Sequence, residues 1–348
     1  MSLLAAISVQ SYATVIPADT IYRQAYDSLN KMLTGQKVLS FKKAVFITEN
    51  AYLNNQLSYK NFNGEIENLA LLITKWINHN RIPNYKYADS LQVLKSYGLY
   101  AILSDTFRIE VEKGVFYTVL PYKYDPDDFF GQRDWTKTFV TKLLNTNSGN
   151  CHSLTYLYKM LADDAGITNA WLSLAPNHIY IRNYCQQTGW YNTELTSGQF
   201  PIDAWIMASG YVSMDAIRSG IYMDTLSNQQ AVAICALDLA KGYERKYANY
   251  ADSFIIKCCD LTLQYHPANI NAIIYKAETL KKMYLFYQNN NPALAKTVYS
   301  DMEKLYVQAI DLGYKEMPEK MYREWLQSVS RQKDKYLNKK VSGKLRSK

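Results

Sequence analysis

The sequence has few of the residues that bind metal ions or build disulfide frameworks. Its 348 residues include five cysteines and four histidines. Cys258 and Cys259 are neighbours on an expected helix, which is not the spacing of a zinc site. An odd number of cysteines without framework spacing gives no disulfide pattern either. We therefore expect neither a structural zinc site nor a disulfide-stapled domain.

Motifs for nucleotide binding and for membrane insertion are also missing. The chain has no Walker loop, no dinucleotide fingerprint and no two-metal cluster. It has no apolar run of about 18 residues or more, the minimum for a membrane-spanning helix. The sequence thus predicts no cofactor and no integral membrane segment.

Charge of one sign is concentrated at the end of the chain. The net charge is +8, and the basic residues that crowd this end are Arg331, Lys333, Lys335, Lys339, Lys340, Lys344, Arg346 and Lys348. A basic tail can contact nucleic acid or anionic lipid, but no nucleic-acid reading module accompanies it. We predict a solvated basic tail over 337–348 and no nucleic-acid partner.

The chain starts with a short apolar run, Leu3 to Val9, followed by Ser11-Tyr12-Ala13. Small residues at positions −3 and −1 are typical of a signal-peptidase site, although the positively charged start of a signal peptide is missing. We interpret 1–19 as a signal-peptide remnant, which favours an exported or periplasmic protein. The alternative is the frayed N-terminus of a cytoplasmic protein.

The rest of the chain has the composition of a folded protein, and its length allows two domains. Hydrophobic residues make up 48% and charged residues 20%. Apolar spacing predicts helices over 20–110, a hairpin over 105–122 and a short helix from Trp135 to Leu144. A further helix begins near 151, and strands are expected at 170–175, 179–183 and 189–195. This alternation gives an α+β core, assigned to 20–220.

The pattern becomes entirely helical after about residue 225. Helices are predicted at 227–243, 249–265, 268–289, 293–312 and 318–336. The junction Tyr265-His266-Pro267-Ala268-Asn269 resembles the turn between consecutive tetratricopeptide repeats. We assign 221–336 to a repeat-like helical domain, with a small helical bundle as the alternative.

Cys151 follows a run of turn and N-cap residues, Asn145 to Asn150, and starts a predicted helix. The first turn of a helix has unpaired N–H groups and the positive end of the macrodipole, which favour a thiolate. The alternative is a buried structural cysteine, since free cysteine is among the most buried residue types.

His178 and Glu194 favour the first interpretation of Cys151. Period-two alternation directs Ile179 and Ile181 to the core and His178 to the other face. If 178–184 and 189–195 form a hairpin, Glu194 lies opposite His178 or diagonal to it, where a carboxylate can fix the imidazole. A nucleophile, a base and an orienting carboxylate are then present together.

These segments resemble the transglutaminase-like branch of the papain-like cysteine enzymes. The matching stretches are Gly149-Asn150-Cys151-His152-Ser153-Leu154, Ala175-Pro176-Asn177-His178 and Trp190-Tyr191-Asn192-Thr193-Glu194. The family has a Cys at a helix N-terminus, a His on a strand and an Asp or Glu on the adjacent strand. The resemblance is clearest over 135–205 and extends over 20–220.

The resemblance implies a papain/transglutaminase-like core, in which N-terminal helices and a Cys-bearing helix pack on an antiparallel sheet. A helical-repeat region after such a domain is similar to what bacterial members carry. This chain departs from the family pattern at two positions: Glu194 stands where Asp is commoner, and Ile179 stands where an aromatic residue usually follows the His.

Other residues are candidates for supporting roles. Asp203 is a second candidate for the carboxylate. His152 is not expected to be the base, because neighbouring helical residues point about 100° apart. The candidates for lining the cleft or donating to an oxyanion are Gln132, Trp135, Asn150 and Trp190.

Two functions from different classes remain open at this point. In the first, Cys151, His178 and Glu194 transfer acyl groups from amide bonds of peptides or proteins, by hydrolysis in preference to transamidation. In the second, the triad is inactive and the protein is a scaffold whose C-terminal helices bind protein or peptide partners.

Overall fold

The computed structural model describes residues 18–112, 114–316 and 333–339, together with the single positions 320, 324, 327, 331 and 341. The helices of its N-terminal half are α1 (Ala18–Leu33), α2 (Phe41–Tyr52), α3 (Tyr59–His79), α4 (Ser90–Ser104), α5 (Val140–Thr146) and α6 (Cys151–Asp164). Those that follow are α7 (Asp203–Gly210), α8 (Met214–Arg218), α9 (Asn228–Tyr247), α10 (Phe254–Tyr265), α11 (Ile270–Tyr287) and α12 (Pro292–Asp311). Together with small sheets, they confirm the α+β class.

Three of the strands form the sheet that carries the site. They are β5 (Ala170–Ala175), β6 (His178–Cys185) and β7 (Gly189–Thr193), in the antiparallel order β5-β6-β7. The other strands are β1 (Phe107–Glu112), β2 (Val115–Val119), β3 (Lys123–Tyr124) and β4 (Ser148–Gly149). The predicted 105–122 hairpin is confirmed as β1 and β2, and each of the three strands predicted after residue 170 is found.

Helix α6 packs on the sheet and is almost completely buried. Its residues from Ser153 to Ala162 are all buried, including the large side chains of Tyr156, Tyr158 and Met160. Burial of apolar side chains on this scale is the main stabilising contribution to a fold. The Cys-bearing helix therefore lies at the centre of the molecule, and its N-terminus is held firmly in place.

The predicted helix from Trp135 to Leu144 is divided in two. A 3-10 turn, η1, spans Trp135–Thr138, and α5 follows it. Phe139, between them, has extended backbone angles, φ −87° and ψ 136°. Glu49 of α2 accepts hydrogen bonds from the N–H groups of Val140 and Thr141, at 2.7 and 3.0 Å, and so caps α5.

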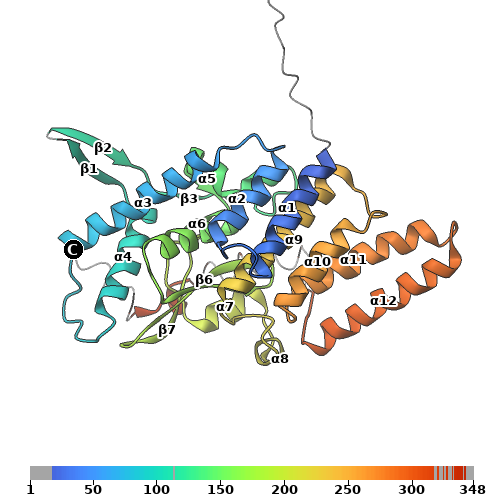
Figure 1. Cartoon of the computed structure of the whole chain (residues 1–348). Coiled ribbons are helices and arrows are strands. Elements are labelled where there is room, and N and C mark those ends of the chain that lie inside the picture. The colour runs from blue at the N-terminus through green and yellow to red at the C-terminus, as the bar shows by residue number, and fades with distance from the viewer. Residues whose placement is uncertain are drawn as a thin grey trace, which may run out of the picture.

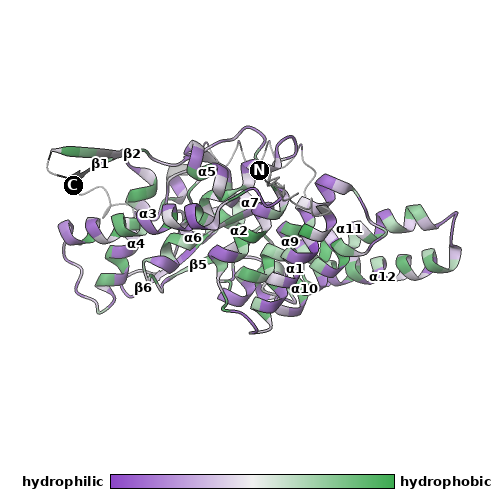
Figure 2. Cartoon of the chain, turned by 45° about the horizontal axis from the view of Figure 1, so that its top comes forward, coloured by the Kyte–Doolittle hydropathy of each residue, from purple (hydrophilic) through white to green (hydrophobic). Residues whose placement is uncertain are grey.

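Helix α9 joins the N-terminal helices in one hydrophobic core. This core runs from Ile21 of α1 to Ala309 of α12 and includes most of α9, where Ala231 to Leu237 are buried. Figures 1 and 2 show α1, α2, α9 and α10 grouped together, while α11 and α12 extend away from them as an antiparallel pair. The predicted boundary between 20–220 and 221–336 thus does not separate two hydrophobic cores.

The helices after residue 225 follow the prediction with small shifts. The helix expected at 249–265 begins only at Phe254, because Ala248 and Ser253 both adopt left-handed backbone angles. The helix expected at 318–336 lies mostly outside the described residues, which include a 3-10 turn, η2, at Lys333–Tyr336. The apolar run at Leu3 to Val9 also lies outside them.

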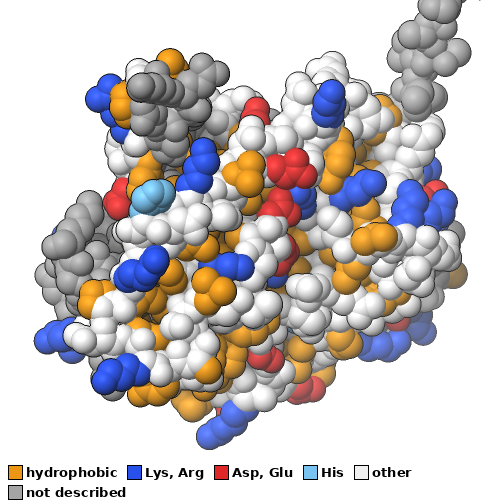
Figure 3. Space-filling view, turned by 60° about the vertical axis from the view of Figure 1, so that its left-hand side comes forward, with side chains coloured by type: hydrophobic (Ala, Val, Ile, Leu, Met, Phe, Trp, Pro, Cys, Tyr) orange, Lys and Arg blue, Asp and Glu red, His pale blue; other side chains and the backbone are white. Residues whose placement is uncertain are grey.

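The start of the predicted basic tail packs on the sheet domain. The Asn338 N–H donates to the Phe200 carbonyl at 2.9 Å, and the Ile202 N–H donates to the Tyr336 carbonyl at 2.9 Å. Val341 is buried in a small cluster with Val93 and Tyr191. The described residues of the predicted tail, 337–339 and 341, therefore pack on the first domain, whereas the sequence had suggested a solvated tail. On the face in Figure 3, Lys and Arg side chains are scattered, and some of them lie beside Asp and Glu side chains.

We predict that Gly149→Ala destabilises the protein by about 1–3 kcal/mol, because the site has no room for a methyl group. A Cβ at Gly149 would overlap the Ser153 hydroxyl and come within 3.0 Å of Leu143 Cδ1. Urea unfolding measures the loss. Gly64→Ala in α3 is the matched control, since a Cβ there meets nothing within 4 Å and alanine favours a helix. Equal stabilities for the two variants would contradict the prediction.

Candidate active site

Cys151 is the first residue of α6, and the helix start is built by its neighbours. Asn150 is the N-cap: its side-chain oxygen accepts from the N–H groups of His152 and Ser153, both at 3.1 Å. The Ser153 hydroxyl accepts in return from the Asn150 N–H at 3.1 Å, which completes a capping box. Cys151 is thereby fixed where the helix dipole favours an anion.

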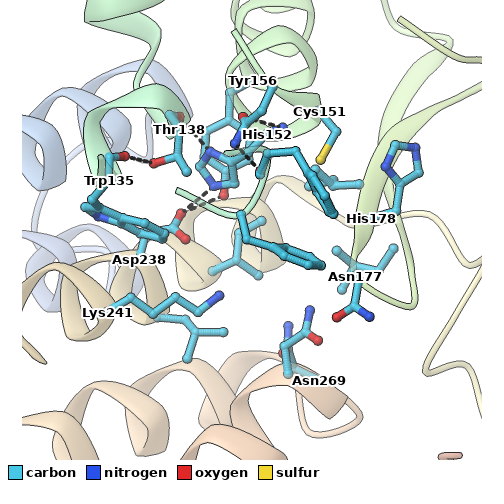
Figure 4. A pocket seen from close by; sticks show the side chains of 18 residues that line it. Trp135, Thr138, Cys151, His152, Tyr156, Asn177, His178, Asp238, Lys241 and Asn269 are labelled. Carbon is cyan, nitrogen blue, oxygen red and sulfur yellow. Dashed lines mark hydrogen bonds and ion pairs between the residues drawn. The ribbon is translucent and has the colours of Figure 1, made fainter. Parts of the chain in front are cut away.

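The Cys151 side chain lines a cavity of about 200 Å³ together with that of His178 (Figure 4). His178 is the first residue of β6 and directly follows a tight turn in which Asn177 has φ 54°. This turn connects β5 to β6, so that Ala175 pairs with His178 at the end of the two strands that borders the cavity. Nucleophile and base are thus brought together by the docking of α6 on the sheet.

Glu194 reaches the same imidazole from the next strand. Ile181 pairs with Thr193, so Glu194 follows the end of β7 and lies diagonal to His178, as expected. The distance from Glu194 Oε2 to His178 Nε2 is 2.5 Å. The other carboxylate oxygen accepts from the N–H and hydroxyl of Thr196, at 3.0 and 2.7 Å. Nε2 is thus occupied by Glu194, and Nδ1 remains for exchange of a proton with the thiol.

Mutual charge sets the protonation of the three groups. Burial opposes ionisation of each of them, but Glu194 raises the pKa of His178 well above its ordinary value. In turn, burial would raise the pKa of Glu194, but His178 and the Thr196 hydrogen bonds lower it. Burial would likewise raise the pKa of Cys151, yet a hydrogen bond and the charge of His178, followed by His152, lower it. The arrangement therefore favours a thiolate beside an imidazolium.

The other four cysteines are in a different environment. Cys185, Cys235, Cys258 and Cys259 are all buried and free. Burial raises the pKa of Cys258 and Cys235 well above the ordinary value, and that of Cys259 to about 12. Only Cys151 thus combines partial exposure with a lowered pKa.

The supporting candidates occupy different positions. Trp135 and Asn150 line the cavity, whereas Gln132 lines an adjoining one. The amide nitrogen of Asn150 donates to the Phe129 carbonyl at 2.9 Å, so it positions the loop and is not free for an oxyanion. Trp190 is nearly half exposed and lies beside Trp171, away from these cavity walls.

Asp203 does not contact His178. It forms an ion pair with Arg182 at 3.0 Å and accepts from the side-chain amide of Asn192 at 2.8 Å. The structure thus places Glu194, and not Asp203, against the imidazole.

Sequence reasoning missed the wall of the cavity that α9 provides. Asp238 and Lys241 of α9 line it, and so do Asn269 and Asn271 near the start of α11 (Figure 4). Asp238 accepts from the Tyr156 hydroxyl at 2.8 Å and lies 3.1 Å from Nε2 of His152. The sequence contained one signal for this wall, because Asp238 is an acidic residue within the apolar pattern of α9. Only tertiary packing brings Asp238 to the site.

Comparisons with known proteins give no family assignment. No family model matches the chain, and no curated protein matches it. Among solved structures, a crystal structure of menin, reported for its binding site for Mixed Lineage Leukemia protein, is similar with a TM-score of 0.34 and 10% identity. The match covers 84% of this chain and 72% of that one. A likeness this weak assigns neither a fold nor a function to this chain.

Neither a metal site nor a membrane span is found in the part of the chain that the structure describes. Its His, Cys, Asp and Glu side chains form no group of three or more that could hold a metal ion. None of its helices is long and apolar enough to cross a membrane.

We expect iodoacetamide to alkylate Cys151 selectively near pH 6. The lowered pKa moves the rise in thiolate, and with it the alkylation rate, below the ordinary thiol range of about 8.5. Peptide mass spectrometry at several pH values measures the rate for each cysteine. Rates for Cys151 that rise only near pH 8.5 would contradict an activated thiol.

Glu194→Gln should lower the pKa of His178, since the carboxylate that raises it is lost. The imidazolium would then lose its proton at a lower pH than in the parent protein. Histidine NMR titration measures this change. Asp203→Asn is the matched control, because it removes a carboxylate that contacts the same sheet without touching His178. A shift in Asp203→Asn but not in Glu194→Gln would show that the wrong carboxylate had been assigned.

Proposed function

We propose that this protein is a thiol-dependent acyl-transfer enzyme that acts on amide bonds of peptides or proteins and resembles the transglutaminase-like branch of the papain-like enzymes. One observation carries the proposal: Cys151 and His178 line one cavity, and the buried Glu194 carboxylate contacts Nε2 of His178. The order Cys on a helix terminus, His on a strand and carboxylate after the adjacent strand is that of the family the sequence resembles.

The reaction follows from the atoms that are available. The Cys151 thiolate attacks the amide carbonyl, a C–S bond forms, and the carbonyl π electrons move to oxygen. When the oxyanion collapses, the C–N bond breaks, and the leaving amine takes a proton from Nδ1 of His178. Water then attacks the thioester carbonyl and forms a C–O bond while His178 accepts its proton, and the C–S bond breaks, which releases the acid and restores the thiolate. Throughout, Glu194 holds the ring and stabilises its charge.

A donor for the oxyanion is available at the helix start. The N–H groups of His152 and Ser153 are bonded to the Asn150 side chain. The N–H of Cys151 precedes them and lies beside the attacking sulfur, so we assign it to the oxyanion. This assignment explains why the capping box matters, because it fixes the direction of that N–H.

Adjoining cavities support a polypeptide substrate. A cavity of about 370 Å³ shares Phe130, Asn177, Lys241 and Asn271 with the one at Cys151. Another, of about 320 Å³, shares Phe129, Cys151, Asn177 and His178 with it. Both enlarge the site, and they also share Pro176, Asn177 and Gly210 with each other, with aromatic and side-chain amide groups on their walls. An extended peptide that crosses Cys151 fits such a series, since amides can pair with both its donors and its acceptors.

A second proposal is that the C-terminal helices bind a protein partner. Leu285, Phe286, Val307 and Ile310 of α11 and α12 are each more than half exposed. Leu285 and Phe286 lie at the end of α11 and Val307 and Ile310 at the end of α12, so each end of the helix pair has a small apolar surface for a partner to bury. This is the scaffold function that would remain if the triad were inactive.

Cys151→Ala should reduce peptide turnover by about 10³-fold or more without unfolding the protein. The full chain is incubated with a peptide library, and mass spectrometry detects new termini and a thioester adduct on Cys151. Cys185→Ala is the control, since Cys185 is at the opposite end of β6 from His178. A Cys151→Ala variant that still cleaves, or a parent protein that forms no adduct, would overturn the enzyme proposal.

A further inference from the structure

His152 has an acceptor at each of its ring nitrogens. Nδ1 is 2.9 Å from the carbonyl oxygen of Thr138, and Nε2 is 3.1 Å from Asp238 Oδ2 (Figure 4). Neither a carbonyl nor a carboxylate can donate a proton. Both hydrogen bonds therefore require both ring nitrogens to be protonated, which makes His152 an imidazolium. With no free nitrogen, it cannot serve as the base.

The surroundings of His152 hold it in this state. Tyr156 donates its hydroxyl to the same Asp238 oxygen at 2.8 Å, and its ring lies 3.8 Å from the imidazole, centroid to centroid. Burial would lower the pKa of His152, but the charge of Asp238 and the bonds to Asp238 and Thr138 raise it. Burial would raise the pKa of the Asp238 carboxyl, but His152 and, to a smaller extent, Lys241 of α9 lower it.

Other ionisable groups also face this pair. They are Glu49 and Tyr52 of α2, Cys151 of α6, His178 of β6 and Cys235 of α9. Burial raises the pKa of Glu49 to about 7, so this carboxyl is only partly ionised at neutral pH. Asp238 is thus the strongest negative partner of His152, and its side chain is only 14% exposed.

We propose that Asp238 is a positioning residue that keeps His152 permanently cationic beside Cys151. This inference rests on the proposed acyl transfer and deepens it. In the reaction, negative charge starts on the sulfur and passes to the carbonyl oxygen, while His178 gives up its own positive charge to the leaving amine. The imidazolium of His152 does not exchange protons, so it keeps a positive charge near the sulfur and the carbonyl oxygen at every stage of the reaction.

The inference gives α9 a part in the active site. Asp238 lies in the segment expected to form a separate helical domain, yet it contacts two residues of α6, His152 and Tyr156. Docking of α9 therefore supplies the charge that fixes His152. Without α9, the Cys151 end of α6 would keep its cap but lose its fixed cation.

The test is the pH profile of Cys151 alkylation in the full-length Asp238→Asn variant, with iodoacetamide as the probe. Asparagine keeps the shape and an acceptor oxygen but removes the charge. We expect the midpoint to rise, so that alkylation near pH 6 is about 3–10-fold slower, while the rate at the high-pH plateau is unchanged. A purely structural role would instead change the plateau or the melting temperature and leave the midpoint in place.

Asp252→Asn is the matched control. Asp252 also accepts from a tyrosine hydroxyl, that of Tyr243, and forms an ion pair with Arg23. Its side chain is 20% exposed, and it lines none of the cavities at Cys151. This variant should keep the parent midpoint. An unchanged midpoint in Asp238→Asn, or an equal shift in both variants, overturns the inference.

Nitrogen-15 NMR of the parent protein labelled at histidine tests the inference without any dependence on a folded variant. With four histidines in the chain, His152 is expected to show two protonated nitrogens at pH 7. One unprotonated nitrogen there overturns the inference. If Cys151 of the parent protein is not activated at all, the proposed function fails. If Cys151 is activated but its activation does not depend on Asp238, only this inference fails.

Discussion

A buried carboxylate must be paired, and the Glu194–His178 contact meets this constraint at the centre of the molecule. Glu194 is 1% exposed, and its carboxylate contacts His178 and accepts hydrogen bonds from Thr196. Leaving such a charge without a partner would cost several kcal/mol. The sheet, the turn at Asn177 and the chain after β7 all have to be in place for the pair to form. Stability and chemistry therefore depend on the same contact.

Helix α6 connects this pair to the rest of the fold. Its buried length packs on the sheet and on the N-terminal helices, and its first turn holds Cys151 against His178. Asn150, Ser153 and Gly149 fix the helix start by capping and by close packing. The nucleophile is thus held by a rigid element and not by a loop, and precise placement of this kind is what proximity in catalysis requires.

The same constraint acts a second time on the other side of Cys151. Asp238 is largely buried, and it is paired with His152 and Tyr156. Because α9 shares the hydrophobic core with α1 and α2, its position is set by apolar packing as well as by this pair. Two His–carboxylate pairs flank one thiol, but they differ in kind: His178 has a nitrogen available for proton transfer, and His152 has none.

Sequence alone determined the local features of this protein. Apolar periodicity located β5, β6, β7 and most helices, and turn and capping residues fixed where α6 begins, because these signals act over a few residues. The expected hairpin placed Glu194 opposite His178 or diagonal to it, and the observed register, in which Ile181 pairs with Thr193, makes it diagonal. Tertiary structure decided what joins distant segments: that Glu194 and not Asp203 meets His178, that α9 belongs to the same core, and that Asp238 pairs with His152. No local pattern specifies these contacts, since they arise only when separate apolar faces are buried together and the charges between them must be paired.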